Sequence, residues 1–328
     1  MFNNSEVLIT GGTGMIGVSL TKLLLKQGAR ITVVSLDKTD PFNGAVKILN
    51  KDLRIYSNCA EVCKNKKFIF HLAGIKGSPQ VALKNPASFF IPTIQFNTNF
   101  LEAAFRSKPD HLLYTSSVGV YAPNNIFYED SVWKTFPSPN DKFSGWAKRL
   151  GELQLEAYSV QYNFSNYSII RPANVYGPYD NFDEDNAMVV PSLIKRALNA
   201  KDELVVWGDG SAIRDFIFAE DVARGMILAV EKKINHPMNL GCGKGISIKE
   251  LVETIVKNIP NKNLKIKWDI SKPSGDKVRI MDMKTANKYD YKTLVTIEDG
   301  IKQTVNWYLN NKNYSDLKYN SFRENKSL

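Results

Sequence analysis

The segment LITGGTGMIG, close to the first residue, constrains the fold more than any other part of the sequence. Three of its glycines follow an apolar run typical of a β-strand and precede a helical pattern. In a β-α-β unit the first such glycine permits a tight turn, the second lets the backbone approach a pyrophosphate, and the third lets helix and strand pack closely. Free amides at the start of the helix favour phosphate. We expect these residues to contact a dinucleotide: Gly11, Thr13, Gly14, Met15, Ile16 and Gly17.

Beyond this loop, short apolar runs alternate with helical patterns. The runs are rich in Val, Ile, Leu and Phe, as strands covered on both faces should be. Strands are expected over residues 7–10, 31–36, 46–48, 68–72, 111–116 and 167–170, and helices over 15–27, 144–161, 190–199, 219–232 and 247–259. The expected fold class is therefore α/β, a Rossmann doubly wound parallel sheet with a smaller C-terminal substrate-binding α/β domain.

The pattern changes after residue 174 to loops rich in Pro, Gly and Asp with helices between them. We expect a dinucleotide-binding Rossmann domain over residues 1–175, with returning segments near 213–235. Residues 176–315 are expected to form mainly a substrate-binding domain. Residues 316–328 are polar and are expected to form a partly frayed tail.

The composition of the chain limits the classes of partner that we expect it to bind. The formal net charge is +10, but the 43 Lys and Arg are scattered, without the basic helix or aromatic-basic stripe that nucleic-acid binding requires. No apolar run reaches the roughly 18 residues of a membrane span, and no secretory signal pattern is found. We expect a cytoplasmic protein that binds neither membrane nor nucleic acid. Its three cysteines are expected to be buried reduced thiols, and no metal-ligand spacing occurs.

The end of the second expected strand, VVSLDK, bears on which nicotinamide is bound. Asp37 could accept hydrogen bonds from both adenosine ribose hydroxyls and would repel a 2′-phosphate, which favours NAD. Asp37 lies two residues later than the usual position, which Ser35 occupies, so Ser35 with Lys38 could instead bind the 2′-phosphate of NADP. Asp52 and Leu53, after the third strand, are placed to meet the adenine.

Several motifs occur together in a fixed order: GGTGMIG at 11–17, HLAG at 71–74, TSSVGVY at 115–121, a helix carrying Lys148, and RPANVYGP at 171–178. With WGDGSAIRDFIFAEDVARGM they resemble the extended short-chain dehydrogenase/reductases, over about residues 5–310. The best match is to nucleotide-sugar epimerases and reductases such as the GDP-fucose synthases. The resemblance implies an NAD or NADP cofactor, with these further contacts: Leu72, Ala73, Gly74, Lys148 and Pro172.

The resemblance also implies a catalytic Ser, Tyr and Lys, in which the Lys four residues after the Tyr favours the phenolate. Ser117 and Lys148 match, but Ser144 stands where the Tyr is expected. The serine hydroxyl is shorter than a phenol and ionises at a much higher pH. A relocated acid or base, low activity, or a substitution introduced into the chain would each account for it.

Three tyrosines are possible substitutes for the lost phenol: Tyr121, Tyr128 and Tyr179. A water molecule beside Ser144 and Lys148 could also relay the proton. Gly119 occupies the position of the GDP-fucose synthases' Cys, and Val118 and Gly119 replace the Asp-Glu pair of the 4,6-dehydratases. What remains is hydride transfer at a sugar carbon, as 4-epimerisation or keto-sugar reduction. The alternative is a catalytically impaired or inactive protein that binds a nucleotide sugar or dinucleotide.

On the substrate side, arginine's planar fork suits a diphosphate. Arg214 resembles a phosphate contact of the family, and Arg279 resembles a second contact to phosphate or to a ribose. Asn174 follows a strand end where ligands bind. Asn186 and Trp207 are expected in the same cleft. The competing interpretation of Arg214 is a surface ion pair with Asp215 or Glu220.

We expect Ser117, Ser144 and Lys148 to cluster at the nicotinamide end of a cleft whose far wall carries Arg214. The partner is then a nucleotide-diphosphate sugar. The resemblance further implies a homodimer, formed by helices near Asn97 and Lys148.

Overall fold

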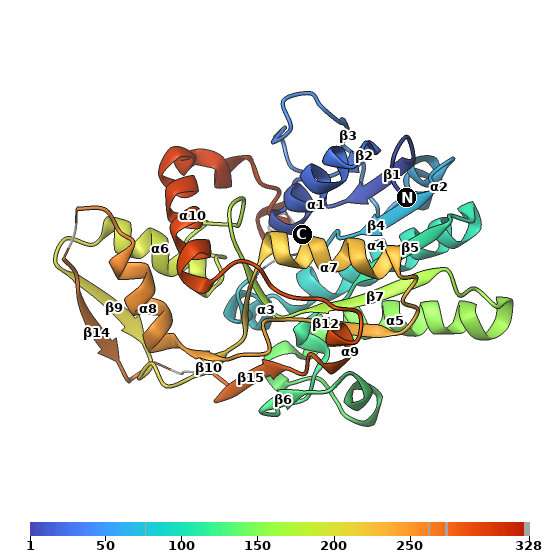
Figure 1. Cartoon of the computed structure of the whole chain (residues 1–328). Helices are drawn as coiled ribbons and strands as arrows, with labels where there is room; N and C mark the ends of the chain where they lie inside the picture. The colour runs from blue at the N-terminus through green and yellow to red at the C-terminus, as the bar shows by residue number, and fades with distance from the viewer. Residues whose placement is uncertain (76, 262, 273–274, 325–328) are drawn as a thin grey trace.

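The computed structural model describes residues 1–75, 77–261, 263–272 and 275–324. Its centre is a parallel sheet of seven strands, ordered β12-β7-β5-β4-β1-β2-β3 (Figure 1). The strands are β1 (Glu6–Thr10), β2 (Arg30–Val34), β3 (Lys47–Leu49), β4 (Phe68–His71), β5 (His111–Thr115), β7 (Tyr167–Pro172) and β12 (Pro237–Leu240). The expected α/β fold class is confirmed.

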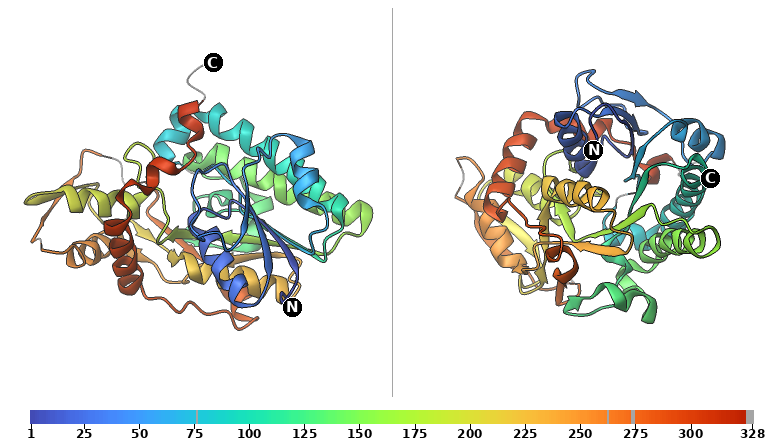
Figure 2. Two further views of the ribbon diagram at one scale, coloured as in Figure 1. Left: turned by 90° about the horizontal axis from the view of Figure 1, so that it is seen from above. Right: turned by 45° about the vertical axis from the view of Figure 1, so that its right-hand side comes forward.

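Helices cover both faces of this sheet (Figures 1 and 2). On one face, α1 (Met15–Lys26) packs beside α7 (Ala219–Glu231), and both contribute to one buried apolar core. On the other face, α2 (Tyr56–Cys63), α4 (Pro86–Ser107) and α5 (Lys142–Tyr162) enclose a second core. The chain thus winds over both faces, as the alternating sequence pattern predicts.

A third core lies in the region farthest from the seven-stranded sheet. It is enclosed by α6 (Val189–Asn199), α8 (Ile248–Lys257) and α10 (Ile297–Asn310), with β9 (Glu203–Trp207) paired to β14 (Lys265–Asp269). Helix α8 begins with a capping box, in which Ser247 and Glu250 satisfy each other's backbone N–H groups.

Short strands join the two regions. One sheet has the order β13-β10-β15-β6, and β11 pairs with β8. Their bounds are β6 (Ile126–Phe127), β8 (Asn174–Tyr176), β10 (Ile213–Arg214), β11 (Phe216–Phe218), β13 (Ile246–Ser247) and β15 (Val278–Met281). The remaining elements are α3 (Pro79–Lys84), η1 (Val118–Val120), η2 (Glu129–Lys134), η3 (Pro139–Asp141) and α9 (Lys284–Asn287).

The C-terminal segment differs from the frayed tail expected from its polar composition. It forms η4 (Lys312–Leu317) and α11 (Ser321–Glu324), while residues 325–328 lie outside the described residues. Aromatic side chains within the polar stretch hold it, since Tyr314 packs on Trp307 and Phe322 packs on Phe89. None of the helices in the described part of the chain is long and apolar enough to cross a membrane.

Candidate active site

The glycine loop has the backbone geometry that its sequence predicts. Gly11 has φ +65°, a conformation that L side chains rarely adopt. A Cβ at Gly17 would lie 2.4 Å from the carbonyl oxygen of Gly11, so only glycine permits this packing of α1 on the loop. Gly14 is the N-cap of α1, and no acidic residue occupies the first turn. The loop therefore presents its amides and the positive end of the helix to an anion.

A chain of hydrogen bonds fixes the neighbouring HLAG segment. The Ala73 N–H donates to Thr10 Oγ1 (3.1 Å), and Thr10 Oγ1 lies 2.7 Å from His71 Nδ1. His71 Nε2 lies 2.9 Å from Asn97 Oδ1, which can only accept, so Nε2 carries the proton and Nδ1 accepts from Thr10. Burial lowers the pKa of His71 to about 3 and keeps the ring neutral. His71 therefore holds the loop in place and does not move protons.

This network places Leu72, Ala73 and Gly74 against the glycine loop. The Leu72 N–H donates to the carbonyl of Thr10 (3.2 Å), and a Cβ at Gly11 would touch the Ala73 nitrogen at 2.9 Å. Two segments far apart in the sequence thus line one stretch of the sheet edge.

The expected adenosine end is occupied by side chains that bind one another. Thr13 Oγ1 donates to Asp37 Oδ2 (2.7 Å) and lies 2.6 Å from Ser35 Oγ. At the end of β3, the Asp52 carboxylate accepts from Arg54 Nη2 (2.6 Å), while Leu53 is buried. Asp52 therefore reaches an arginine of its own loop rather than pointing freely toward a ligand.

The expected catalytic serines converge on Gly119. A Cβ at Gly119 would lie 3.5 Å from both Ser117 Oγ and Ser144 Oγ, and 3.4 Å from Cβ of Asp141. Ser117 caps η1 by accepting from the Gly119 N–H (3.1 Å), and Ser144, in the first turn of α5, donates to the carbonyl of Asp141 (3.0 Å). The absent Cβ leaves both hydroxyls beside one small space.

Lys148 lies one turn further along α5. Its Nζ donates to the carbonyl of Thr115 (2.8 Å), lies 5.2 Å from the centre of the Tyr114 ring, and would lie 4.0 Å from a Cβ at Gly74. Burial lowers the pKa of Lys148 to about 8, while the charge of Glu152 opposes that shift. The amine is therefore able to lose or gain a proton close to neutral pH.

A buried ion pair anchors α5 to the sheet. Arg171 on β7 donates to both carboxylate oxygens of Glu152, at 2.9 and 2.6 Å, and both side chains are almost fully buried. Arg171 also donates to Tyr121 Oη (3.2 Å) and the carbonyl of Glu129 (2.8 Å). The helix that carries Ser144 and Lys148 is thereby held in a fixed position.

Two arginines lie beside this cluster on paired strands. Arg214 of β10 is the register partner of Arg279 of β15. Arg279 binds Asp141 through Nη1 (2.7 Å), and it also pairs with Asp276. Asp141 therefore connects Arg279 to Ser144.

Arg214 has a different environment. Its Nη1 donates to the carbonyl of Ile213 (2.8 Å), and among the described residues it forms no ion pair, so the pairs considered with Asp215 and Glu220 do not occur. Burial, and then the charge of Arg279, lower the pKa of Arg214. A partly buried guanidinium without a carboxylate partner is suited to receive an anionic ligand.

Asp215 sets the position of Arg214. Its carboxylate accepts from the backbone N–H groups of Cys242 (2.8 Å) and Gly243 (3.0 Å), and its carbonyl accepts from Asn174 Nδ2 (3.0 Å). Burial raises the pKa of Asp215 to about 6. This residue therefore ties β10 to the loop after β12 and to the start of β8.

The other expected substrate residues are more dispersed. Asn186 is buried, and its Oδ1 accepts from the Ser78 N–H (3.2 Å). Trp207 ends β9 in the region of the third core, with Lys272 Nζ 5.9 Å from its ring centre. Pro172 ends β7 and is buried. Asn186 thus lies beside the start of α3, and Trp207 lies in the outer region of the molecule.

The tyrosines considered as substitutes are engaged in other contacts or exposed. Tyr121 is 1% exposed, and its hydroxyl donates to Asn239 Oδ1 (2.6 Å). Tyr179 accepts from Lys22 Nζ (3.1 Å) and packs on Trp307. Tyr128 is 41% exposed. None is seen in contact with the serine cluster among the residues described.

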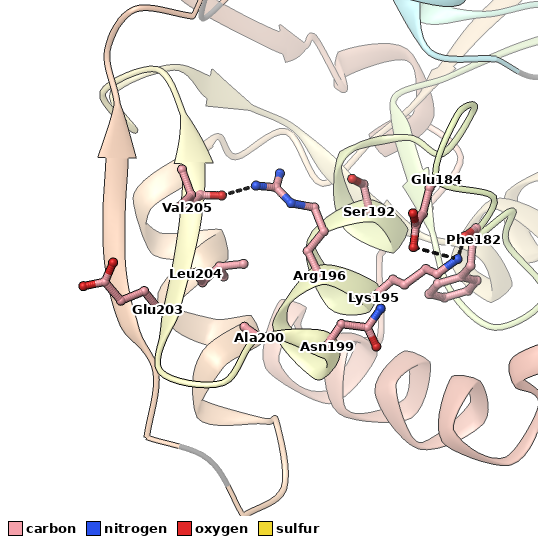
Figure 3. Close-up of a pocket in the computed structure, with 10 residues that line it drawn as sticks. All are labelled: Phe182, Glu184, Ser192, Lys195, Arg196, Asn199, Ala200, Glu203, Leu204 and Val205. Carbon is pink, nitrogen blue, oxygen red and sulfur yellow. Dashed lines mark hydrogen bonds and ion pairs between the residues drawn. The ribbon is translucent and has the colours of Figure 1, made fainter.

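A separate pocket lies between α6 and β9 (Figure 3). Its cationic side chains are engaged, because Lys195 pairs with Glu184 (3.2 Å) and Arg196 donates to the carbonyl of Val205. None of the residues expected at the site from sequence lines this pocket. It contains neither the serines nor Lys148.

The sheet, the glycine loop and the Ser117–Lys148 arrangement define an extended short-chain dehydrogenase/reductase. Residues 7–241 match the NAD dependent epimerase/dehydratase family, and the chain belongs to that family. The protein is thus an NAD(P)-dependent enzyme of the epimerase and reductase type.

Individual relatives agree with this assignment. The chain is 30% identical over 320 residues to a probable GDP-L-fucose synthase 1 of Oryza sativa subsp. japonica, covering 93% of this chain and 92% of that protein. A UDP-N-acetylglucosamine 4-epimerase from Methanobrevibacter ruminantium M1, solved in complex with UDP-N-acetylmuramic acid, aligns with TM-score 0.82 at 25% identity, covering 94% and 99% of the two chains.

A GDP-L-fucose synthetase from Naegleria fowleri bound to NADP aligns with TM-score 0.80 at 21% identity, over 95% of this chain and 96% of that one. At this identity the likeness concerns the fold.

Proposed function

We propose that this enzyme transfers a hydride at a carbon of a nucleotide-diphosphate sugar, either in 4-epimerisation or in reduction of a keto-sugar. The observation that carries the proposal is the position of Arg214. It is a guanidinium without an ion-pair partner among the described residues, next to Arg279, which connects through Asp141 to Ser144. The names of the rice relative and the Methanobrevibacter epimerase support the same substrate class.

The residues of the first half fit a nicotinamide dinucleotide. Gly11, Gly14 and Gly17, with Met15 and Ile16 at the start of α1, form the expected pyrophosphate site. Asp37 and Thr13 would meet the adenosine ribose, and this carboxylate favours NAD, whereas NADP is named for the Naegleria structure. A bound nicotinamide supplies or accepts the hydride.

Leu72, Ala73, Gly74 and Pro172 would line the cofactor further along the sheet edge, toward Lys148. Leu53 would border the adenine, and Lys38 and Asp52 complete the set of residues expected to contact the dinucleotide. This assignment rests on the position of each residue after a parallel strand, where ligands bind in open α/β sheets.

The proton requires a donor other than a tyrosine. Reduction of a keto group produces an alkoxide, and Ser117 and Ser144 would donate hydrogen bonds to that oxygen from either side of Gly119. We assign the proton to Lys148, because it lies one helical turn from Ser144 on α5 and its pKa of about 8 lies close to neutral pH. A serine at position 144 leaves room for the ammonium, or one water bound to it, to reach the oxygen.

The diphosphate would bind Arg214 and Arg279, where two guanidiniums on paired strands present planar forks. Asn174 would meet the pyranose or a phosphate at the same sheet edge. Asn186 and Trp207 would contact the outer part of the substrate. The proposed cofactor contacts lie in the expected Rossmann domain, and most of the proposed substrate contacts lie in the expected substrate-binding domain.

We also propose a cytoplasmic homodimer. Helices α4 and α5 pack side by side, and their outer faces carry exposed apolar residues, among them Ile91, Leu150 and Leu153. Exposed apolar patches of this kind mark interfaces. The buried thiols of Cys59 and Cys63 fit a reducing compartment.

The test is turnover with UDP-, GDP- and dTDP-linked sugars, in both 4-keto and 4-hydroxy forms, with each nicotinamide. A reductase would consume reduced cofactor in proportion to the keto-sugar, whereas an epimerase would convert the sugar without net cofactor change. Binding of a sugar nucleotide without conversion under either condition would instead establish the inactive alternative.

A substitution of Arg214 tests where the nucleotide sugar binds. Arg214→Met should weaken nucleotide-sugar binding by about 10- to 100-fold, because the loss of a charge-assisted contact costs roughly 1.5–3 kcal/mol. Affinity for the dinucleotide should be unchanged. Arg30→Met is the matched control, because Arg30 is exposed at the start of β2, at the other end of the strand from Asp37. It should change the affinity for neither the nucleotide sugar nor the dinucleotide.

A further inference from the structure

The end of the chain lies on the glycine loop. Residues 312–322, here called the C-terminal strap, leave α10 and run back to α4 (Figure 2). Lys318 Nζ donates to the carbonyl of Thr13 (3.0 Å), and Tyr314 Oη donates to the same carbonyl (3.3 Å). The strap therefore binds the loop that is expected to hold the dinucleotide.

The strap also binds Asp37. Asp37 Oδ1 accepts from the backbone N–H of Tyr319 (2.8 Å), and Oδ2 lies 3.7 Å from Lys318 Nζ. Nearby, the Lys38 N–H donates to the carbonyl of Leu317 (3.0 Å). The side chains of Lys318 and Asp37 are only 12% and 13% exposed, so this is a shielded ion pair.

These contacts use the atoms that an adenosine ribose would use. In a Rossmann fold, an acidic residue after the second strand accepts from the ribose hydroxyls. Here both oxygens of Asp37 already have partners, two of which come from the strap. Ribose and strap therefore compete for one carboxylate.

We propose that the C-terminal strap is an internal competitor that occupies the adenosine end of the dinucleotide site and leaves when the dinucleotide binds. The inference rests on the proposed cofactor site. Dinucleotide affinity is then set by the fraction of molecules in which the strap is undocked, because the apparent dissociation constant is the intrinsic one divided by that fraction.

The anchoring of the strap is compatible with release. Its apolar contacts are aromatic: Tyr314 lies 5.1 Å from Trp307 and 5.5 Å from Tyr179, and Phe322 lies 6.4 Å from Phe89. Asn320 Nδ2 also donates a hydrogen bond to Asp183 Oδ2 (3.2 Å). Lys312, Asp316 and Leu317 are exposed. Covalent attachment to α10 keeps the released strap at a high effective concentration, so it can dock again when the ligand leaves.

Truncation after Asn311 tests the competition. Calorimetric titration with NAD, NADP and ADP-ribose should show about tenfold tighter binding of each ligand to the truncated chain. Lys318→Ala should act in the same direction with a smaller effect. Lys312→Ala, at an exposed position of the same segment, should bind like the unchanged protein.

Proteolysis supplies a second measurement on the full-length protein. Dinucleotide binding should accelerate tryptic cleavage at Lys318, which is opposite to the protection that ligands usually give. Slower cleavage, or equal or weaker binding after truncation, would overturn the competition and would assign the strap as a cover or a bystander. No binding to either chain would instead overturn the proposed cofactor site itself.

Discussion

At the scale of single residues, a buried neutral histidine organises the sheet edge where we propose that the nicotinamide binds. His71 links Asn97 on α4 to Thr10 at the end of β1, and Thr10 in turn receives the Ala73 N–H. Each member satisfies the next, so removing one leaves at least one buried polar atom unpaired. The network explains why a histidine occurs at this position without any role in proton transfer.

Replacing Thr10 with valine tests that network. Thr10→Val keeps the shape but leaves the Ala73 N–H and His71 Nδ1 without partners, so unfolding free energy should fall by roughly 2–3 kcal/mol. Urea denaturation measures the change. Thr304→Val is the control, because that buried hydroxyl only donates to the carbonyl of Gly300 in its own helix, and it should cost under about 1 kcal/mol.

The proton donor makes a second prediction at this scale. If Lys148 donates the proton, kcat/KM for keto-sugar reduction should fall as pH rises above about 8, because the acid must be protonated to act. Ser144→Tyr should place a phenol between Lys148 and the substrate and raise kcat by about 10- to 100-fold.

Combining substitutions of Lys148 and Ser144 supplies the control for this prediction about the proton donor. Lys148→Met should abolish most activity in the unchanged chain but cost less in the Ser144→Tyr chain, where the phenol can donate. Equal losses in both backgrounds, with no basic limb near pH 8, would mean that Lys148 only orients its neighbours.

At the scale of elements, a buried ion pair helps to hold α5 on the sheet. Glu152→Ala would leave the Arg171 guanidinium buried without its carboxylate, which should lower the unfolding free energy by about 3–5 kcal/mol. The basic limb of the activity profile should also move to lower pH, since the charge of Glu152 raises the pKa of Lys148.

Denaturation and the pH profile measure these two effects separately. Asp130→Ala breaks the exposed pair with Lys134 and should change stability by under about 1 kcal/mol. A loss of similar size in both variants would show that burial of the Arg171–Glu152 pair is not what holds α5.

The elements themselves were largely predictable from sequence. Helix α1 was expected over 15–27 and runs Met15–Lys26, and β7 was expected over 167–170 and runs Tyr167–Pro172. Buried strands and amphipathic helices repeat their apolar residues at fixed periods, which a sequence displays directly. Their ends differ by one or two residues because caps and turns, not periodicity, set the boundaries.

The site was predictable only where motifs are local. The glycine loop lies within one strand-turn-helix segment, whereas Asp141 and Arg279 meet across 138 positions. Asp141 lies in no recognised motif, and Asp215 lies within WGDGSAIRDFIFAEDVARGM without a role that the motif itself indicates. Both roles appear only once distant strands are paired. The docked strap was missed for a related reason: in a polar stretch, Tyr314, Tyr319 and Phe322 were the signal, but composition favoured disorder.

At the scale of the whole molecule, α4 and α5 carry apolar side chains that remain exposed in the described part of the chain. Leu150 and Leu153 lie one turn apart on α5 and are 39% and 47% exposed, and Ile91 on α4 is 49% exposed. A twofold axis between such helix pairs would bury these residues against their copies. Helix α5 carries Ser144 and Lys148, so dimer formation would also stiffen the helix that holds these proposed catalytic residues.

Leu153→Glu should therefore convert the proposed dimer to a monomer, because two buried carboxylates would face each other near the axis without counterions. Light scattering after gel filtration measures the mass at several protein concentrations. Leu294→Glu, at a leucine that is 70% exposed and lies outside both helices, should leave the mass unchanged. If the Leu153 variant stays dimeric, the chains associate through another surface. If the unchanged protein is monomeric at every concentration, the proposed assembly is wrong.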